Sequence, residues 1–240
     1  MVVLHAPAKL TVSLSIDGVR DDGYHLINAE MVSLNLHDLI ELTDGDALEI
    51  VGPQSVQGMV SLERNLVRRA LALCSRSAAI RLHKHIPLGA GLGGGSADAA
   101  AVLRWAGYTD LTKAATIGAD VAFCLQGGRA RVSGIGEIVE PLPFVERSVT
   151  LLTPPVHCST REVYAKWDRL GGPSSDNGND LEPAALAVAP ELHRWRDQLG
   201  NASGQRPRLA GSGSTWWVDG EHAGEGLVIA RTVPAFAPAA

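Results

Sequence analysis

The chain has 240 residues, of which 45 % are hydrophobic and 20 % are charged, and its formal net charge is −5. A chain of this length buries a substantial core, either as one large domain or as two small ones. A chain with net negative charge lacks the excess of basic residues that binds nucleic acids or anionic membranes, so neither is expected as a partner. No apolar run reaches 18 residues, which argues against a membrane-spanning helix.

The cysteines are three, Cys74, Cys124 and Cys158, and they are far apart with no C-x-x-C pair. An odd number at such spacing indicates reduced thiols, and hence a cytoplasmic protein. The first residues lack both the basic region and the long apolar region of a signal peptide, which agrees with that location. No Cys and His residues have the spacing of a metal site, so the sequence leaves any metal ligands unknown.

The first part of the chain is expected to be mostly strands. Apolar and polar residues alternate, and strands are expected over residues 2–16, 31–36, 38–42, 47–51 and 79–85. Asn65 is expected to cap a helix over residues 66–75. Several strands before any helix favour an antiparallel sheet and the α+β class.

A glycine-rich segment follows the strand at 79–85 and is the most informative stretch of the chain. Five glycines fall between Gly89 and Gly95, directly before Ser96. Because glycine adopts positive φ and has no Cβ, backbone N–H groups in such a segment can converge on an anion. Ser96 is expected to cap a helix over residues 97–106, whose positive dipole end then faces the loop. The sequence therefore predicts a phosphate-binding site.

Three other interpretations of the glycine segment are less favoured. It satisfies G-x-G-x-x-G, but the preceding strand is alternating and charged, and a further helix follows, so no dinucleotide-binding βαβ unit is completed. It lacks the Gly-Lys-Ser/Thr of a Walker loop. A flexible linker would not be framed by a strand and a well-formed helix.

Some polar residues stand in positions that need an explanation. Lys9 lies either at a strand edge in water or in a functional site. Asp120 lies in an apolar stretch and requires a partner, because burying an unpaired carboxylate is costly. Tyr24 beside His25 could grip a flat base, although a packed tyrosine and a solvated histidine are the plainer interpretation.

The junction between two domains, residues 1–145 and 146–240, is expected at the Pro-Leu-Pro of residues 141–143. Thr160 is expected to cap a helix that runs to Leu170. The remaining expected elements are strands over 148–153, 216–218 and 226–233, a long helical region from 179 to 200 bent at its prolines, and a frayed tail over 234–240.

Several short segments together resemble the GHMP small-molecule kinase superfamily. They are Ala-Pro-Ala-Lys at 6–9, the glycine segment with its flanks at 87–97, and Ala-Gly-Ser-Gly at 210–213. Within the superfamily the chain is similar to the family of 4-diphosphocytidyl-2-C-methyl-D-erythritol kinases, through Asp-Gly-Tyr-His at 22–25, Gly-Ala-Asp-Val at 118–121, Gly-Glu-Ile at 136–138 and Asn-Asp-Leu-Glu-Pro at 179–183. The resemblance spans nearly the whole chain.

The resemblance implies a two-domain GHMP kinase fold of the α+β class. Its N-terminal half would be like the second domain of a small-subunit ribosomal protein, and its C-terminal half would be ferredoxin-like without the last helix. It also implies transfer of the γ-phosphate of ATP to the 2-hydroxyl of 4-(cytidine 5′-diphospho)-2-C-methyl-D-erythritol, in the non-mevalonate route to isoprenoids. ATP and Mg²⁺ would be the cofactors, with the Ser96 hydroxyl a candidate metal ligand, and the protein would be a monomer or a homodimer.

The same resemblance assigns roles to individual residues of this chain. Asp120 would be the catalytic base and Lys9 its partner. The nucleotide would be bound by the glycine segment and two nearby residues: Pro87, Leu88, Gly89, Ala90, Gly91, Leu92, Gly93, Gly94, Gly95, Ser96, Ala97, Asn65 and Lys84. The cytidine substrate would be bound by Thr11, Tyr24, His25, Thr160, Tyr164, Gly211, Ser212 and Gly213.

Two alternatives to this activity remain. One is a GHMP kinase for mevalonate, homoserine or galactose, which the aromatic residues Tyr24 and Tyr164 beside His25 argue against. The other is a nucleotide-binding relative without catalysis, which the presence of both Lys9 and Asp120 argues against.

The chain departs from the family pattern at four places. Thr11 stands where an Asn is usual, Ala122 where a Pro is usual, and Tyr164 where a Phe is usual. The fourth is the stretch 219–226, which is too short and glycine-rich for the usual helix. Without that helix, one face of the small C-terminal sheet would be uncovered. A partner subunit, or the two tryptophans at 216 and 217, would then shield it.

Overall fold

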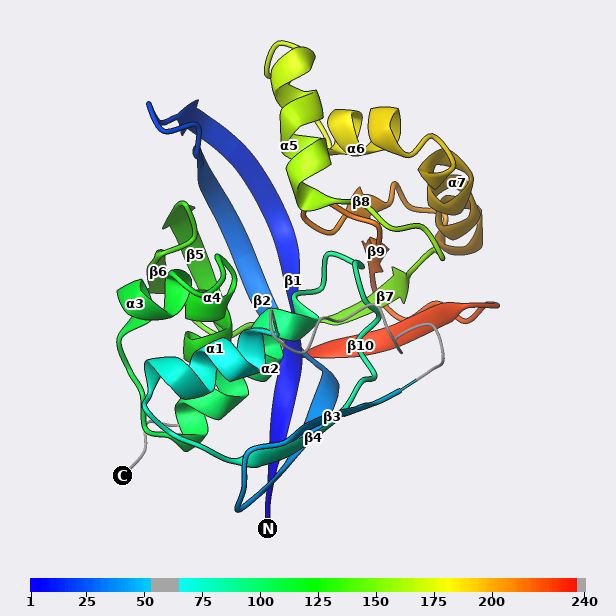
Figure 1. Ribbon diagram of the computed structural model, residues 1–240. Helices are drawn as coiled ribbons and strands as arrows, with labels where there is room; N and C mark the ends of the chain where they lie inside the picture. Colours follow the sequence, from blue (N-terminus) through cyan, green and yellow to red (C-terminus); the bar gives the residue numbers. More distant parts are fainter. Residues whose placement is uncertain (53–64, 237–240) are drawn as a thin grey trace.

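A hairpin of two long strands is the backbone of the fold. The computed structural model describes residues 1–52 and 65–236. In it β1 (Val2–Val19) and β2 (His25–Thr43) pair antiparallel along almost their whole lengths (Figure 1). The two strands expected over 31–36 and 38–42 are one continuous strand, because His37 and Asp38 keep the ladder by pairing with Pro7 and Ala6. Because His37 and Asp38 are polar, the sequence pattern suggested that the strand ends there.

The middle of β1 departs from regular alternation. Residues 8–11 are buried one after another, and the pairing register shifts between Pro7 and Lys9. Such a β-bulge redirects a side chain that would otherwise point to the opposite face. The Lys9 N–H donates to the carbonyl of Leu92 at 3.0 Å, so the bulge also ties the strand to the glycine segment.

Strand β2 is the hub of a large, mostly antiparallel sheet. One of its edges carries β1, and the other pairs in turn with β5 (Arg129–Gly134), β10 (Leu227–Val233) and β4 (Ala79–His83). Within the described N-terminal half, two further strands extend this sheet: β3 (Leu48–Val51), parallel to β4, and β6 (Ile138–Pro141), antiparallel to β5. The α+β class expected from the order of elements is confirmed.

The helices of the N-terminal half gather on one side of the hairpin (Figure 1). They are α1 (Leu66–Leu73), α2 (Gly94–Trp105), α3 (Leu111–Ala115) and α4 (Val121–Gln126). Asn65 caps α1 as expected, since its side chain accepts the Val67 N–H at 2.9 Å. The expectation that Ser96 caps α2 is wrong. Gly93 holds that position with a φ of 68°, which favours glycine, and Ser96 lies in the first turn.

In its described residues, the C-terminal half supplies three helices and a small sheet to which β10 also belongs. Its elements are β7 (Ser148–Leu152), α5 (Thr160–Arg169), α6 (Glu182–Val188), α7 (Leu192–Ser203), β8 (Arg208–Leu209) and β9 (Trp216–Asp219). The cap of α5 is Ser159 and not Thr160, because the Ser159 hydroxyl accepts the Glu162 N–H. The expected long helix over 179–200 is two helices, since the chain breaks at Ala189 and Pro190.

The two halves share one continuous sheet. Strand β10 pairs with β7 and then with β2, where Thr232 and Val233 lie opposite Leu34 and Ser33. The division at residues 145 and 146 therefore stays a prediction about domains that are joined through their strands.

The end of the chain is more ordered than expected. Ala235 bridges to Gly127, and the Arg104 guanidinium lies 3.6 Å from the centre of the Phe236 ring, so residues 235 and 236 are not frayed. Residues 237–240 of the expected tail lie outside the described residues.

As expected, no helix lies between β9 and β10 in the described chain. Trp216 and Trp217 are fully buried, whereas Val228 and Ile229 of β10 are about half exposed. No helix among the described residues combines the length and apolarity needed to cross a bilayer.

Candidate active site

A cleft of roughly 560 Å³ runs between the two halves of the molecule. Two glycine-rich turns reach it, the glycine segment and the Ala-Gly-Ser-Gly of residues 210–213, as do β1, β2 and α5. Of the residues expected to bind nucleotide or substrate, those lining the cleft are Thr11, Tyr24, His25, Pro87, Leu88, Gly89, Ala90, Gly91, Gly93, Gly94, Gly95, Ser96, Thr160, Tyr164, Gly211 and Ser212, together with Lys9 and Asp120. Residues far apart in the sequence thus face one space.

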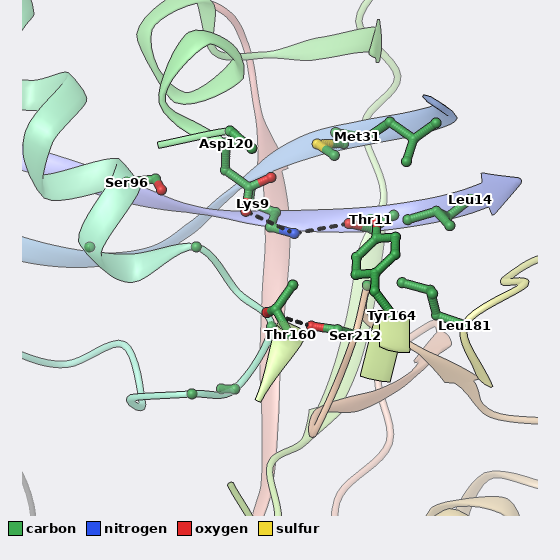
Figure 2. Close-up of a pocket in the computed structure, with 18 of the residues that line it drawn as sticks. Lys9, Thr11, Leu14, Met31, Ser96, Asp120, Thr160, Tyr164, Leu181 and Ser212 are labelled. Atoms are coloured by element: carbon green, nitrogen blue, oxygen red, sulfur yellow. Dashed lines mark hydrogen bonds and ion pairs between the residues drawn. The ribbon is translucent and has the colours of Figure 1, made fainter. Parts of the chain in front are cut away.

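Lys9 and Asp120 meet in the wall of this cleft. The Lys9 Nζ lies 3.3 Å from the Asp120 Oδ2, and it donates a hydrogen bond of 3.1 Å to the Thr11 hydroxyl (Figure 2). The Lys9 side chain is only 7 % exposed, while that of Asp120 is 31 % exposed. Lys9 is therefore in the site and not at a strand edge, and Asp120 has the partner that its apolar neighbours required. Its carboxylate remains open to a ligand.

Close packing explains why glycine stands at two positions of the segment. Gly91 has a φ of 75°, and a Cβ there would lie 2.3 Å from the carbonyl oxygen of Ala210. A Cβ on Gly93 would lie 2.7 Å from the Lys9 Cγ. Glycine thus lets the two glycine-rich turns touch and lets Lys9 pass beside the start of α2. The N–H groups of the first turn of α2 have no carbonyl of their own helix within reach, so they are available to a ligand in the cleft.

The opposite end of the cleft carries aromatic and hydroxyl groups. The His25 Nε2 lies 2.7 Å from the Asp168 Oδ1, and the His25 ring centre lies 4.7 Å from that of Tyr164. Tyr24 is 59 % exposed, so its ring is free to meet a ligand. Across the cleft the hydroxyls of Thr160 and Ser212 are hydrogen-bonded at 2.9 Å (Figure 2).

Five of the expected residues do not line the cleft. Leu92 and Ala97 are buried behind the glycine segment, and Gly213 packs against Leu209 and Cys158. Asn65 and Lys84 instead line a smaller cavity of roughly 160 Å³. That cavity shares Leu66, Leu88 and Gly95 with the cleft, so the two spaces adjoin.

The Lys84 ammonium is held by two buried carboxylates. It is paired with Asp38 and lies 2.7 Å from the Asp98 Oδ2. The second oxygen of Asp38 accepts the N–H groups of His85 and Ile86, just before the glycine segment, and Asp98 lies in α2, just after it. Burial raises the pKa of Asp98 to about 7, against the opposing pull of Lys84. This cluster, Asp38–Lys84–Asp98, therefore braces both ends of the glycine segment.

Comparison with known proteins agrees with this geometry. A family model described as the GHMP kinases N terminal domain matches residues 64–128. The 4-diphosphocytidyl-2-C-methyl-D-erythritol kinase of Paracoccus denitrificans is 37 % identical over 230 residues, which is 88 % of this chain and 84 % of that protein. That of Geobacillus kaustophilus is 33 % identical over 249 residues, covering 88 % and 86 %. The chain belongs to the 4-diphosphocytidyl-2-C-methyl-D-erythritol kinase family.

Solved structures support the same placement. A crystal structure of 4-(cytidine 5′-diphospho)-2C-methyl-D-erythritol kinase matches with a TM-score of 0.71 at 26 % identity, covering 96 % of this chain and 99 % of that one. A mevalonate kinase matches with a TM-score of 0.56 at 10 % identity, which shows the shared fold alone. The chain is thus an ATP-using phosphotransferase with the GHMP kinase fold.

Sequence reasoning missed several residues of this kinase site. Asp38, Asp98 and Asp168 each pair with a cation or histidine at or beside the cleft, and none was singled out. Asp98 carried the same signal as Asp120, an acidic residue inside an apolar stretch. Apolar wall residues were also missed: Leu14, Ile27, Met31, Ile135 and Leu181.

Proposed function

We propose that this chain transfers the γ-phosphoryl group of ATP to the 2-hydroxyl of 4-(cytidine 5′-diphospho)-2-C-methyl-D-erythritol, with Asp120 as the base. The observation that carries the proposal is the Asp120 carboxylate, 3.3 Å from the Lys9 ammonium in a cleft that the glycine segment also lines. A tertiary alcohol is a poor nucleophile. A carboxylate within hydrogen-bond reach accepts its proton as the bond to phosphorus forms. Lys9 offsets the negative charge that develops on the attacking oxygen.

The phosphates of ATP bind to the glycine segment in this proposal. The N–H groups at the start of α2 and the positive end of its dipole supply the attraction, in place of a Walker lysine. Asn65 and the smaller cavity take the nucleoside end, and Lys84 acts beside it by holding the segment. When bound with ATP, Mg²⁺ would offset the charge of the β- and γ-phosphates. The oxygens of Ser96 and Asp120 line the same space and are the donor type that this cation prefers.

The cytidine substrate occupies the other end of the cleft. Its base lies between the rings of Tyr24 and Tyr164 and is bound by His25, which lies against Tyr164. Thr160, Gly211 and Ser212 face the diphosphate, and Thr11 lies beside the reacting alcohol, hydrogen-bonded to Lys9. The base therefore contacts residues of both halves of the chain.

An assay of ADP release with a panel of acceptors tests the proposal. The panel contains the cytidine diphosphate substrate, methylerythritol 4-phosphate without the CDP group, mevalonate and homoserine. We expect turnover that depends on the CDP group, with the other acceptors at background. Equal or better turnover with mevalonate or homoserine would refute the substrate, and no turnover with any acceptor would refute the activity.

A further inference from the structure

The His25 ring is enclosed by one face of α5. Its Nε2 lies 2.7 Å from the Asp168 Oδ1, its ring centre lies 4.7 Å from that of Tyr164, and Trp167 meets it edge-on at 5.5 Å. Positions 164, 167 and 168 are three and four residues apart, so they share one side of the helix. The His25 side chain is only 11 % exposed, yet the residue lines the cleft.

In the neutral imidazole, this contact determines which ring nitrogen donates and which accepts. A neutral imidazole has one N–H donor and one bare nitrogen that accepts. An ionised carboxylate only accepts, so Asp168 takes the hydrogen on Nε2. The Nδ1 of His25 is then left as an acceptor for a group bound in the cleft.

We propose that Asp168 is a positioning residue that fixes His25 as an acceptor and so makes the site select cytosine over uracil. The inference rests on the proposed function, in which the base of the substrate binds at Tyr24, His25 and Tyr164. Cytosine carries an exocyclic amino group, which donates, where uracil carries a carbonyl, which accepts. A uracil carbonyl facing Nδ1 would place two acceptors opposite each other and leave both without a hydrogen bond. A site that hydrogen-bonds the amino group of cytosine therefore binds uracil less well.

Without the carboxylate, the imidazole is free to exchange tautomers or rotate. The form with hydrogen on Nδ1 would donate to the uracil carbonyl, so the penalty against uridine substrates should fall. One hydrogen bond of this kind contributes about 1 kcal/mol, which corresponds to roughly fivefold in the ratio of rates. Stacking on Tyr164 does not distinguish the two bases, so it is unaffected.

Kinetic selectivity gives the first test. The variants are Asp168→Asn and Asp168→Ala, and the matched control is Glu162→Gln, which removes one charge from an exposed position on the same helix. For each, kcat/KM is measured with the cytidine diphosphate substrate and with its uridine counterpart, together with the KM for ATP. We expect the preference for cytidine to fall about fivefold in Asp168→Ala and by less in Asp168→Asn, whose amide oxygen still accepts the hydrogen on Nε2. The KM for ATP should be unchanged in both, and the control should behave like the parent. An unchanged preference in an active Asp168→Ala variant would overturn the inference.

The tautomer is measured independently by ¹⁵N NMR of the histidine rings, with His25→Gln used to assign the signals. We expect hydrogen on Nε2 in the parent chain and a shift toward mixed tautomers in Asp168→Ala. Hydrogen on Nδ1 in the parent would overturn this inference alone. Absence of turnover with both nucleotide substrates in the parent would instead refute the proposed function, and the inference with it.

Discussion

The buried cluster Asp38–Lys84–Asp98 makes the stability of this chain depend on pH in a specific way. Two carboxylates share one ammonium, and one oxygen of Asp98 has no hydrogen-bond partner among the described residues. Burial raises the pKa of Asp98 to about 7 in the folded chain, from the ordinary value of 3.8 for an aspartate side chain in water. Between these two values the folded chain binds a proton that the unfolded chain does not. The contribution of Asp98 to stability is therefore greatest below the lower value and is lost as the pH rises through about 7.

The size of the effect follows from the two pKa values. One pKa unit corresponds to about 1.4 kcal/mol, so raising the pH from 5 to 8 should remove about 2–3 kcal/mol of stability through this group. The perturbation is Asp98→Asn, which keeps the shape and removes the titration. Urea unfolding at several pH values measures the free energy of unfolding of the parent and the variant, with Asp44→Asn, at an exposed position, as the control.

The test compares the free energy of unfolding of the parent with that of Asp98→Asn at each pH. We expect the stability of the parent relative to Asp98→Asn to fall by about 2–3 kcal/mol between pH 5 and pH 8, while the Asp44 control follows the parent. A difference that stays flat over this range would refute the reasoning. It would mean that Lys84 keeps the Asp98 carboxylate charged throughout.

Two further predictions concern the two ends of the cleft. Gly91→Ala should lower the Tm and raise the KM for ATP more than Gly107→Ala does. Both residues have a φ above 70°, but only at Gly91 would the new Cβ collide, at 2.3 Å from the Ala210 carbonyl oxygen; equal effects in thermal melts and kinetics would argue against close packing of the turns. Tyr24→Ala should raise the KM for the cytidine substrate several-fold and leave the KM for ATP unchanged, because a stacked base contributes about 1–3 kcal/mol. An equal rise in both constants would make Tyr24 a structural residue.

The sequence anticipated much of the fold because the signals involved are local. The alternation in β1 and the Asn65 cap each depend on a few neighbouring residues. Errors arose where two local signals competed. Ser96 looked like a cap, but the backbone at Gly93 adopts the left-handed conformation that begins α2 one turn earlier. Ser159, one residue before Thr160, offered the same kind of side chain and takes the cap of α5.

The residues of the site also differ in whether a local signal predicts them. The glycine segment is a local signal, so composition and spacing alone predict a phosphate-binding site there; that the segment lines a cleft comes from the structure. The partnership of Lys9 with Asp120 came from family resemblance, because nothing local connects residues so far apart; the structure brings them to 3.3 Å. Asp38 and Asp168 could not be found, since each looks like an ordinary polar residue until the fold brings it to Lys84 or His25.

The central claim is that Asp120 accepts the proton of the attacking hydroxyl, and the turnover of Asp120→Asn tests it most directly. ADP release is measured with saturating cytidine substrate, and the affinity for a non-hydrolysable ATP analogue is measured alongside. The account predicts analogue binding close to that of the parent and a kcat lower by about 10²-fold or more. A kcat close to that of the parent, with the fold intact, would contradict it.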